Sequence, residues 1–424
     1  MKKALLVLAA GVVLVGAGLV AYGLYRKHQG RNIHGSSSQE FNTTETKAKP
    51  IKPTAKIRWP MYRFDAARQG APEGVLQAVV PPFRPLWFFR AGSLVEFPPA
   101  IAYGKLYFAN AKGTLFAVDG KHVRTAWHLT THRCTAATPA VDRHTVYMTF
   151  LNHPPCNATR SGIDGEVVAL NADTGKLRWR VRMGPTESSP LVANGLVYVG
   201  DWTGKVYALS AATGRTVWSY QTGDKVKDGL ALAGKHVYFG SYDSHVYALN
   251  ARTGKLFWRS SAQQRLGPSG TFYSTPAVAY DRVYLGSTDG NVYSFGAATG
   301  RLAWRHGTGG YVYGSPAVAK VPRGRPTVYI GSYDNKLYAL DARTGRPRWT
   351  RSAEGKISGG TVVIGDLVFY STLARTTTAV GARTGRFVWR TRKGAFNPVV
   401  SDGHRLFLMG YSSVFALKPK KRRN

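Results

Sequence analysis

The chain has 424 residues, of which 44% are apolar, so it can bury a substantial core. Its formal net charge is +36, and residues 59–417 carry +23 of this, beside +8 on residues 1–58 and +5 on residues 418–424. A positive surface of this size attracts polyanions, although net charge does not determine a fold. The two cysteines, Cys134 and Cys156, belong to no CxxC or Cys/His cluster, which excludes the common zinc sites.

The first predicted element is an N-terminal membrane anchor. Two lysines precede a continuous apolar run over residues 4–24. A helix of this length spans about 30 Å, which is the thickness of the hydrocarbon core of a bilayer. The run is longer than the apolar part of an ordinary secretory signal. We therefore expect residues 1–29 to form an uncleaved anchor, and cleavage after Ala17 is the alternative.

Residues 30–58 are expected to form a flexible tether, because they are rich in Ser, Thr and Lys and show almost no apolar periodicity. Basic residues flank both ends of the apolar run, so the positive-inside rule encodes its orientation weakly. The cysteine pair fits an oxidising compartment. We therefore expect a single-pass protein of a bacterial cell membrane, with the rest of the chain on the extracytoplasmic side and Cys134 disulfide-bonded to Cys156.

An eleven-residue element then recurs along the chain. Its copy at residues 169–179 reads ALNADTGKLRW, and five later copies end in the same tryptophan. A degenerate copy at residues 117–127 has Val123 where the others have Gly. Successive tryptophans are 39 to 52 residues apart. A period of this length is typical of propeller blades or of a solenoid.

The content of each repeat selects the propeller. In residues 190–218, the pairs Asn194-Gly195 and Thr203-Gly204 are hairpin signals, and a further Thr-Gly pair leads into the last strand. No helical pattern lies between the repeats, which argues against parallel or helical repeats. Four antiparallel strands per repeat predict one blade of a β-propeller.

The two ends of the chain complete the count of blades. Trp87 lies in an isolated β-rich run 40 residues before Trp127, whereas residues 397–417 supply only three strands. We expect the isolated run to join these three strands, because such closure removes exposed sheet edges. The prediction is an all-β, eight-bladed propeller of four-stranded antiparallel blades over residues 59–417, followed by a basic tail at residues 418–424.

One tryptophan per blade is expected to pack between neighbouring blades. A large aromatic side chain that recurs at a fixed position of a repeat is interpreted as core packing rather than as a stacking platform. These structural docking residues are Trp87, Trp127, Trp179, Trp218, Trp258, Trp304, Trp349 and Trp389.

The repeat resembles that of the pyrroloquinoline-quinone (PQQ) repeat family of propellers. The resemblance rests on the element Thr-Gly-(Lys/Arg)-x-x-Trp, whose spacing is that of the family's tryptophan docking motif, and on hairpins such as VYLGSTDG at residues 283–290. It covers residues 59–417. The family includes PQQ-dependent alcohol and sugar dehydrogenases, and also non-enzymatic binding or scaffold propellers.

The sequence departs from the enzymatic members of the family that it resembles. Those alcohol dehydrogenases have adjacent cysteines under the cofactor, whereas Cys134 and Cys156 are 22 residues apart. They also use an acid and an amide on a calcium ion with an Asp as base, and no comparable Asp cluster or haem-binding CxxCH is found here. The resemblance therefore implies the fold and favours the non-enzymatic branch. No cofactor is expected, and PQQ with calcium is the alternative.

A candidate ligand site is predicted at the mouth of the central channel. The first strand of each blade should line the channel, and propellers tend to bind ligands at its mouth. The first strands are aligned on a proline that six blades share and that Leu230 and Thr361 replace in the other two. The column three residues earlier contains Glu96, Glu187, Lys227, Tyr273 and Tyr313. These side chains would form a polar pocket, and the acidic pair would suit a cation. The alternative is that they are solvated loop residues.

The sequence thus favours a membrane-anchored binding or scaffold module without catalysis. Its expected partners are the membrane, through residues 4–24, and another envelope protein or an anionic polymer, and we expect a monomer. The first alternative is a PQQ-dependent dehydrogenase. The second is a binder of anionic wall polymer or lipid headgroups. Nucleic acid is not expected, because no aromatic and basic motif of a known nucleic-acid module is present.

Overall fold

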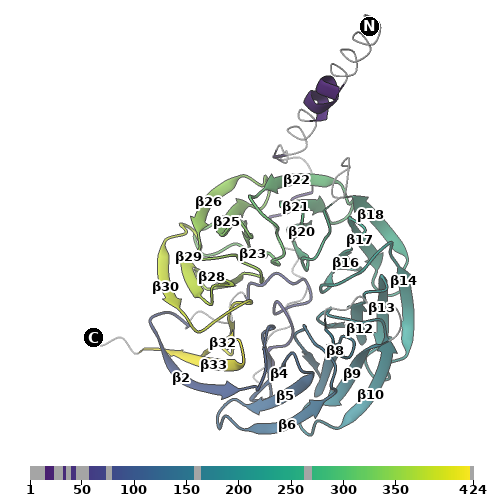
Figure 1. Cartoon of the computed structure of the whole chain (residues 1–424), viewed down its shortest axis with the longest axis vertical. Coiled ribbons are helices and arrows are strands. Elements are labelled where there is room, and N and C mark those ends of the chain that lie inside the picture. Colours follow the sequence, from purple (N-terminus) through teal and green to yellow (C-terminus); the bar gives the residue numbers. More distant parts are fainter. Residues whose placement is uncertain are drawn as a thin grey trace, which may run out of the picture.

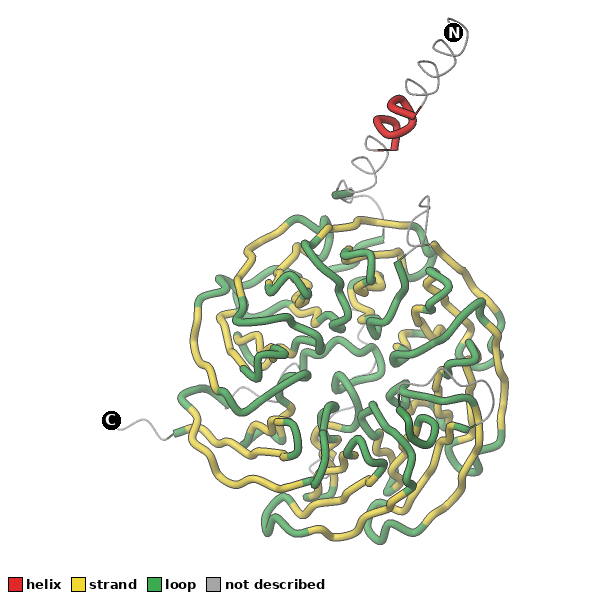
Figure 2. Tube along the Cα trace, viewed as in Figure 1, coloured by secondary structure: helices red, strands yellow, loops and turns green. Residues whose placement is uncertain are grey.

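The computed structural model describes residues 15–22, 32–34, 40–43, 57–72, 79–156, 164–261 and 270–420. Eight antiparallel sheets are arranged as blades around a central axis (Figures 1 and 2). The eight-bladed propeller predicted from the tryptophan repeat is therefore confirmed.

The innermost strands are two or three residues long and rich in Ala and Val. In blade order they are β3 (Ala100–Ala102), β7 (Ala140–Asp142), β11 (Leu191–Ala193), β15 (Ala231–Ala233), β19 (Ala277–Ala279), β23 (Ala317–Ala319), β27 (Val362–Ile364) and β31 (Val400–Ser401). The second strands are β4 (Lys105–Ala109), β8 (Thr145–Phe150), β12 (Leu196–Gly200), β16 (His236–Gly240), β20 (Arg282–Gly286), β24 (Thr327–Gly331), β28 (Leu367–Ser371) and β32 (Leu406–Gly410).

The third strands are the buried centres of the blades, and the outermost strands form the rim. The third strands are β5 (Thr114–Asp119), β9 (Gly165–Asn171), β13 (Lys205–Ser210), β17 (His245–Asn250), β21 (Asn291–Gly296), β25 (Lys336–Asp341), β29 (Thr377–Gly381) and β33 (Ser413–Pro419). The outermost strands are β6 (Thr125–Thr130), β10 (Leu177–Met183), β14 (Thr216–Gln221), β18 (Leu256–Ser261), β22 (Leu302–Gly307), β26 (Pro347–Ser352), β30 (Phe387–Thr391) and β2 (Phe83–Arg90).

The last blade is built from both ends of the propeller. Strand β2 pairs antiparallel with β33, with Trp87 opposite Ala416, and the sheet order is β2-β33-β32-β31. The structure thus contains the composite blade that was predicted from Trp87. Pairing of the N-terminal strand with the C-terminal hairpin closes the ring.

The tryptophans on the outermost strands bind the next blade through a repeated contact. The Nε1 of Trp127 donates a hydrogen bond to the carbonyl oxygen of Ala172 at 3.0 Å, and the Tyr107 hydroxyl donates to the same oxygen at 3.0 Å. The ring lies over Gly175, where an added Cβ would be 2.7 Å from it. Glycine is required there for this close approach and for a φ of +71°. The same hydrogen bond to the next blade recurs at Trp179, Trp218, Trp258, Trp304 and Trp349.

The two tryptophans at the closure of the ring pack differently. Trp389 packs edge-on against Phe83, with ring centroids 5.0 Å apart, and Trp87 packs against Phe407 at 5.8 Å. Among the described residues, the buried Nε1 of Trp87 has no hydrogen-bond partner. The corresponding turn of the first blade has Val123 in place of glycine. The closure therefore depends on strand pairing rather than on the docking contact.

The chain before the first blade fills the central channel, which sequence analysis did not predict. Strand β1 (Ile57–Trp59) adds a fifth strand to the first blade by pairing with β3. The following residues 60–71, here called the channel segment, cross the middle of the ring (Figures 1 and 2). Its carbonyls accept hydrogen bonds of 2.7–2.9 Å from the innermost strands of five further blades, through the N–H groups of Val141, Leu232, Val278, Val318 and Val363.

The N-terminal residues are described only in part. Residues 15–22 are helical, and within the described ranges no helix is long and apolar enough to span a bilayer. The membrane helix of residues 4–24 is thus not shown, and most of it lies outside the described residues. In the predicted tether, Ile33 bridges to Arg305 on β22, and the Phe41 ring lies 5.4 Å from that of Tyr280. At the C-terminus, residues 421–424 of the predicted basic tail are not described.

Candidate functional site

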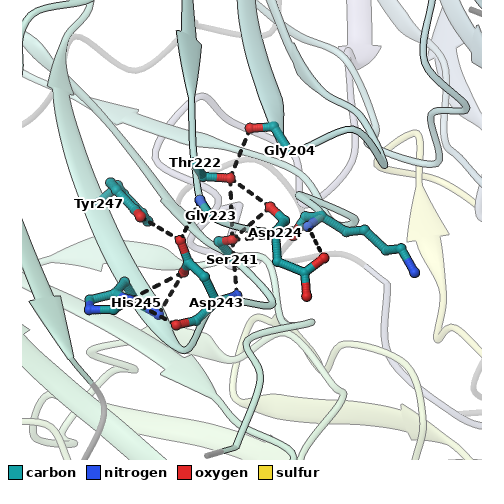
Figure 3. A network of polar contacts seen from close by, with 9 residues as sticks. Gly204, Thr222, Gly223, Asp224, Ser241, Asp243, His245 and Tyr247 are labelled. Atoms are coloured by element: carbon teal, nitrogen blue, oxygen red, sulfur yellow. Dashed lines mark hydrogen bonds and ion pairs between the residues drawn. The ribbon is translucent and has the colours of Figure 1, made fainter. Parts of the chain in front are cut away.

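One face of the ring is formed by two sets of loops. The mouth loops precede the innermost strands, and the hairpin turns join the second and third strands of each blade. In the fourth blade Asp243 ties the two together, because its carboxylate accepts hydrogen bonds from the N–H of Gly223 at 2.9 Å and from the hydroxyl of Tyr247 at 2.5 Å (Figure 3). The Ser241 hydroxyl also donates to the Asp224 carbonyl at 3.0 Å. The mouth loop of this blade is therefore held by its hairpin turn.

Equivalent acidic residues in other blades also connect the mouth loop to the hairpin turn. Asp334 accepts hydrogen bonds from the Gly309 N–H at 2.8 Å and the Tyr338 hydroxyl at 2.5 Å, and Asp201 accepts from the Gly184 N–H at 3.0 Å. The acids of the hairpin motif thus have structural partners, and they position the mouth loops.

Four of the five predicted channel-mouth residues come together in a chain of contacts. Glu187 is buried, and its carboxylate forms an ion pair of 2.9 Å with Lys227. The Tyr273 hydroxyl donates a hydrogen bond of 3.4 Å to the other oxygen of Glu187. The Tyr313 ring lies edge-on to that of Tyr273, with centroids 5.4 Å apart. Residues from four successive blades therefore meet at the mouth.

The fifth predicted residue, Glu96, lies within electrostatic range of this group. Burial and then the charge of Glu187 raise the pKa of Glu96 to about 7. Its backbone carbonyl accepts a hydrogen bond of 3.1 Å from Asn397, but no described residue forms an ion pair or hydrogen bond with its carboxylate. The charge of the mouth therefore changes near neutral pH.

The mouth also contains aromatic residues that sequence analysis missed. Trp202 and Tyr333 lie in the hairpin turns of the third and sixth blades, and Tyr242 lies in that of the fourth. The Nε1 of Trp202 donates to Glu187 at 3.0 Å, and the rings of Tyr333 and Tyr313 are 4.9 Å apart. A signal was present, because each of these residues occupies the variable position of the Gly-(Ser/Asp)-x hairpin motif. The alignment of the first strands covers the mouth loops and does not include these turns.

Three of these rings surround the ammonium group of Lys227. Its Nζ lies 4.5 Å from the ring centroid of Trp202, 5.1 Å from that of Tyr273 and 5.4 Å from that of Tyr242. These distances are within the range of about 6 Å for cation–π attraction. We refer to Trp202, Tyr242, Tyr273 and Glu187 as the aromatic cage.

The channel segment forms the floor beneath the mouth. Arg68, which is fully buried, donates hydrogen bonds from Nε to the Leu230 carbonyl at 2.9 Å and from Nη2 to the carbonyls of Ser189 and Pro190 at 3.0 Å. Leu230, Ser189 and Pro190 lead into the innermost strands of the third and fourth blades. The guanidinium group therefore connects the floor to the loops that present Glu187 and Lys227.

The charges in the floor are shifted by their burial. Burial lowers the pKa of Arg63 and of Arg68 to about 10, and it raises the pKa of Asp65 and of Asp228 to about 6. Asp228 accepts hydrogen bonds of 2.7 Å from the N–H groups of Gly229 and Thr275, which lower its pKa in part. The charges of Asp65 and Asp228 act in the opposite direction on the two arginines and raise their pKa in part.

The two cysteines lie away from this group, in the second blade. Cys134 and Cys156 form a disulfide with their Cα atoms 5.5 Å apart. The Cys134 N–H donates to the Asn152 carbonyl at 2.9 Å, and the Leu151 N–H donates to the Cys134 carbonyl at 2.9 Å. The disulfide therefore joins the mouth loop of this blade to the segment after its second strand.

The residues at the axis do not fit PQQ with calcium. A planar quinone on the axis would need the volume that the channel segment fills with backbone and with the side chains of Tyr62, Arg63 and Arg68, which are 0–4% exposed. Within the described ranges, no three His, Cys, Asp or Glu residues lie close enough together to hold a metal ion.

The family is decided by the sequence of the repeats. Residues 163–391, more than half of the chain, match the family described as outer membrane protein assembly factor BamB. The chain belongs to the BamB family of PQQ-repeat propellers. This confirms the resemblance inferred from the docking motif. A BamB of Burkholderia pseudomallei (strain K96243) is 30% identical over 132 residues, which is 31% of each protein.

Solved structures show the same fold at lower identity. BamB of Moraxella catarrhalis superposes with a TM-score of 0.66 at 20% identity, covering 80% of this BamB-family chain and 100% of the other. The quinohemoprotein alcohol dehydrogenase of Comamonas testosteroni gives a TM-score of 0.69 at 14% identity, covering 88% and 82%. At these identities the likeness concerns the fold and does not extend to the activity.

Proposed function

We propose that this protein is a membrane-anchored, extracytoplasmic scaffold that holds a protein partner at the channel mouth and catalyses no reaction. The observation that carries the proposal is the channel segment, which closes the axis and leaves the mouth as a walled site. The floor is fixed by backbone hydrogen bonds to five blades and by Arg68. A rigid floor with polar and aromatic walls suits recognition at a surface.

The composition of the mouth supports a protein partner. Trp202, Tyr242, Tyr273, Tyr313 and Tyr333 are each partly exposed there. Tyrosine and tryptophan are enriched at protein interfaces, where they supply apolar contact area together with a hydrogen-bonding group. The relatives are assembly factors by name, which agrees with a role in binding other proteins.

The location rests on the apolar run and on the disulfide. Residues 4–24 are long enough to span a bilayer as a helix, and a disulfide between Cys134 and Cys156 fits an oxidising compartment. We infer that the propeller lies outside the cytoplasmic membrane, on the tether of residues 30–58.

Site-specific crosslinking in cells tests the proposal. A photo-crosslinking amino acid in place of Tyr311, which is 53% exposed beside Tyr313, should capture one dominant protein partner. The matched control is the same amino acid at Ala212, an exposed position in a turn on the opposite face. Capture at Ala212 but not at Tyr311, or no capture at either, would contradict the proposal.

A binder of anionic polymer is the second candidate, and the rim of the propeller favours it. Exposed arginines lie on or beside the outermost strands, among them Arg84, Arg182, Arg259, Arg386 and Arg392. Such a surface would be retained on an anionic matrix and released steeply by salt, because each contact displaces counterions. Retention that does not depend on salt would remove this candidate.

A further inference from the structure

We propose that the aromatic cage is a binding site for a lysine side chain of the partner, and that Lys227 occupies it as a displaceable internal ligand. The inference rests on the proposed function, in which a polypeptide binds at the mouth. It adds the chemistry of one contact and a mechanism that keeps the site closed in the absence of that partner.

The geometry is that of a site for a cation. The ammonium group of Lys227 lies 4.5–5.4 Å from three ring centroids and 2.9 Å from a carboxylate oxygen of Glu187. Trp202 and Tyr273 each donate a hydrogen bond to Glu187, so the rings and the carboxylate are held as a unit. Aromatic rings around a cation are a recurrent means of recognising ammonium groups.

The burial of Glu187 restricts what can replace Lys227. The Glu187 side chain is 9% exposed, and a buried carboxylate that loses its cation is strongly destabilised. A neutral or anionic group that displaced Lys227 would leave this charge uncompensated, and the nearby carboxylates of Glu96 and Asp228 would add to the cost. The cage therefore selects a cation.

Lys227 itself is placed so that it can leave. Its side chain is 19% exposed, and among the described residues its ammonium group forms one ion pair, with Glu187, and contacts three aromatic rings. A lysine stem is flexible and its ammonium group is readily hydrated, so the displaced group can move into solvent. While Lys227 occupies the cage, an external cation cannot bind there. The apparent Kd for the external cation therefore equals its intrinsic Kd divided by the fraction of molecules in which the cage is empty.

The experiment compares two small probes on purified protein. Two probes are used: Nα-acetyl-lysine amide, which keeps its side-chain ammonium group, and its neutral analogue Nα-acetyl-norleucine amide. Their binding to wild type and to Lys227→Ala is measured by calorimetry. If Lys227 fills the cage for at least about nine-tenths of the time, its removal should tighten binding of the lysine probe by about tenfold or more. Binding of the norleucine probe should not change.

Three further variants make the result specific. Lys225→Ala is the matched control, because its ammonium group is 5.9 Å from the Trp202 ring but forms no ion pair with Glu187. It should leave binding unchanged. Trp202→Ala in the Lys227→Ala background should remove the gain. Lys227→Gln, which keeps a polar side chain, repeats the test if Lys227→Ala unfolds, as monitored by thermal melting.

The outcomes separate this inference from the proposed function. No gain on removal of Lys227, or an equal gain for both probes, would overturn the cage even if Tyr311 crosslinks a partner in cells. A gain for the lysine probe without any crosslinked partner would support the cage and contradict the proposed function instead.

Discussion

Replacement of Arg68 by methionine should strongly destabilise the propeller. The guanidinium group is fully buried and donates to the carbonyls of Leu230, Ser189 and Pro190, and also to that of Tyr62 within the channel segment. Methionine fills most of the volume but donates no hydrogen bond, so four carbonyls lose their donor. We therefore expect a loss from hydrogen bonding and charge, and little from the creation of a cavity.

The size of the loss follows from these contacts. A buried carbonyl that loses its hydrogen-bond donor lowers the free energy of unfolding by about 1–3 kcal/mol. Removal of one member of a buried group of charged and polar partners typically lowers it by about 3–5 kcal/mol in total. The free energy of unfolding should fall by about 3–5 kcal/mol. At about 2 °C per kcal/mol for a large domain, this corresponds to a decrease in Tm of about 6–10 °C.

The loss should also depend on pH. Burial raises the pKa of Asp228 to about 6, and the charge of Arg68 acts against this rise. A carboxyl group whose pKa is higher in the folded state than in the unfolded state costs no stability at low pH, where it is protonated in both states. It lowers the free energy of unfolding as the pH rises from its pKa in the unfolded state through its pKa in the folded state. In Arg68→Met the pKa of Asp228 rises further. The destabilisation should thus be larger at pH 8 than at pH 5.

Thermal unfolding followed by circular dichroism at both pH values is the measurement. Arg215→Met, at an exposed turn on the opposite face, is the control and should change the free energy of unfolding by less than about 0.5 kcal/mol. If Arg68→Met has a Tm within about 2 °C of wild type, the channel segment does not hold the floor in the manner described.

The remaining predictions concern the mouth and the blade contacts. Glu96→Gln should stabilise the protein by about 1–2 kcal/mol at pH 8, because the pKa of Glu96 is raised to about 7. The gain should vanish as the pH falls below about 4, where the carboxyl becomes protonated in both the folded and the unfolded state. Equal melting temperatures of the variant and wild type at pH 8 would contradict this. In wild type, binding of a cationic probe at the mouth should strengthen from pH 6 to pH 8, as Glu96 ionises, and calorimetry at both values would show it. Gly175→Ala should cost more than Gly195→Ala by about 1–3 kcal/mol: both glycines have φ above +70°, but only Gly175 lies under a tryptophan ring. Equal costs in chemical unfolding would show that the docking contact tolerates a methyl group.

The blades could be predicted because the sequence motifs that form them are close together in the chain and recur in each repeat. The Thr-Gly turn, the hairpin and the docking Trp lie within about 30 residues of one another in each repeat, and their period gives the count. Even the composite blade could be inferred, since Trp87 and the unpaired C-terminal strands each lacked a partner. The role of Tyr107, which shares the Ala172 carbonyl with Trp127, cannot be read from its own repeat, because its partner lies in the next blade.

The channel segment could not be predicted for a physical reason. Its carbonyls accept hydrogen bonds from backbone N–H groups of five blades, and contacts of this kind leave no side-chain pattern in the sequence. Sequence analysis would place Arg63 and Arg68 at the surface, because arginine is rarely fully buried, but both are buried here. At the mouth, the alignment of the first strands places Glu187, Lys227 and Tyr273 in one column, and in the structure Glu187 contacts both of the others. The aromatic residues of the hairpin turns come from another part of each blade, and this alignment did not include them.

The claim that the closed axis leaves no place for a cofactor is tested most directly with PQQ and calcium. The purified protein is titrated with both, and the reduction of an artificial electron acceptor is followed in the presence of alcohols and sugars. A channel filled by residues 60–71 predicts no stoichiometric binding of PQQ and no reduction of the dye. One equivalent of tightly bound PQQ together with dye reduction would contradict a non-catalytic scaffold that binds at its mouth.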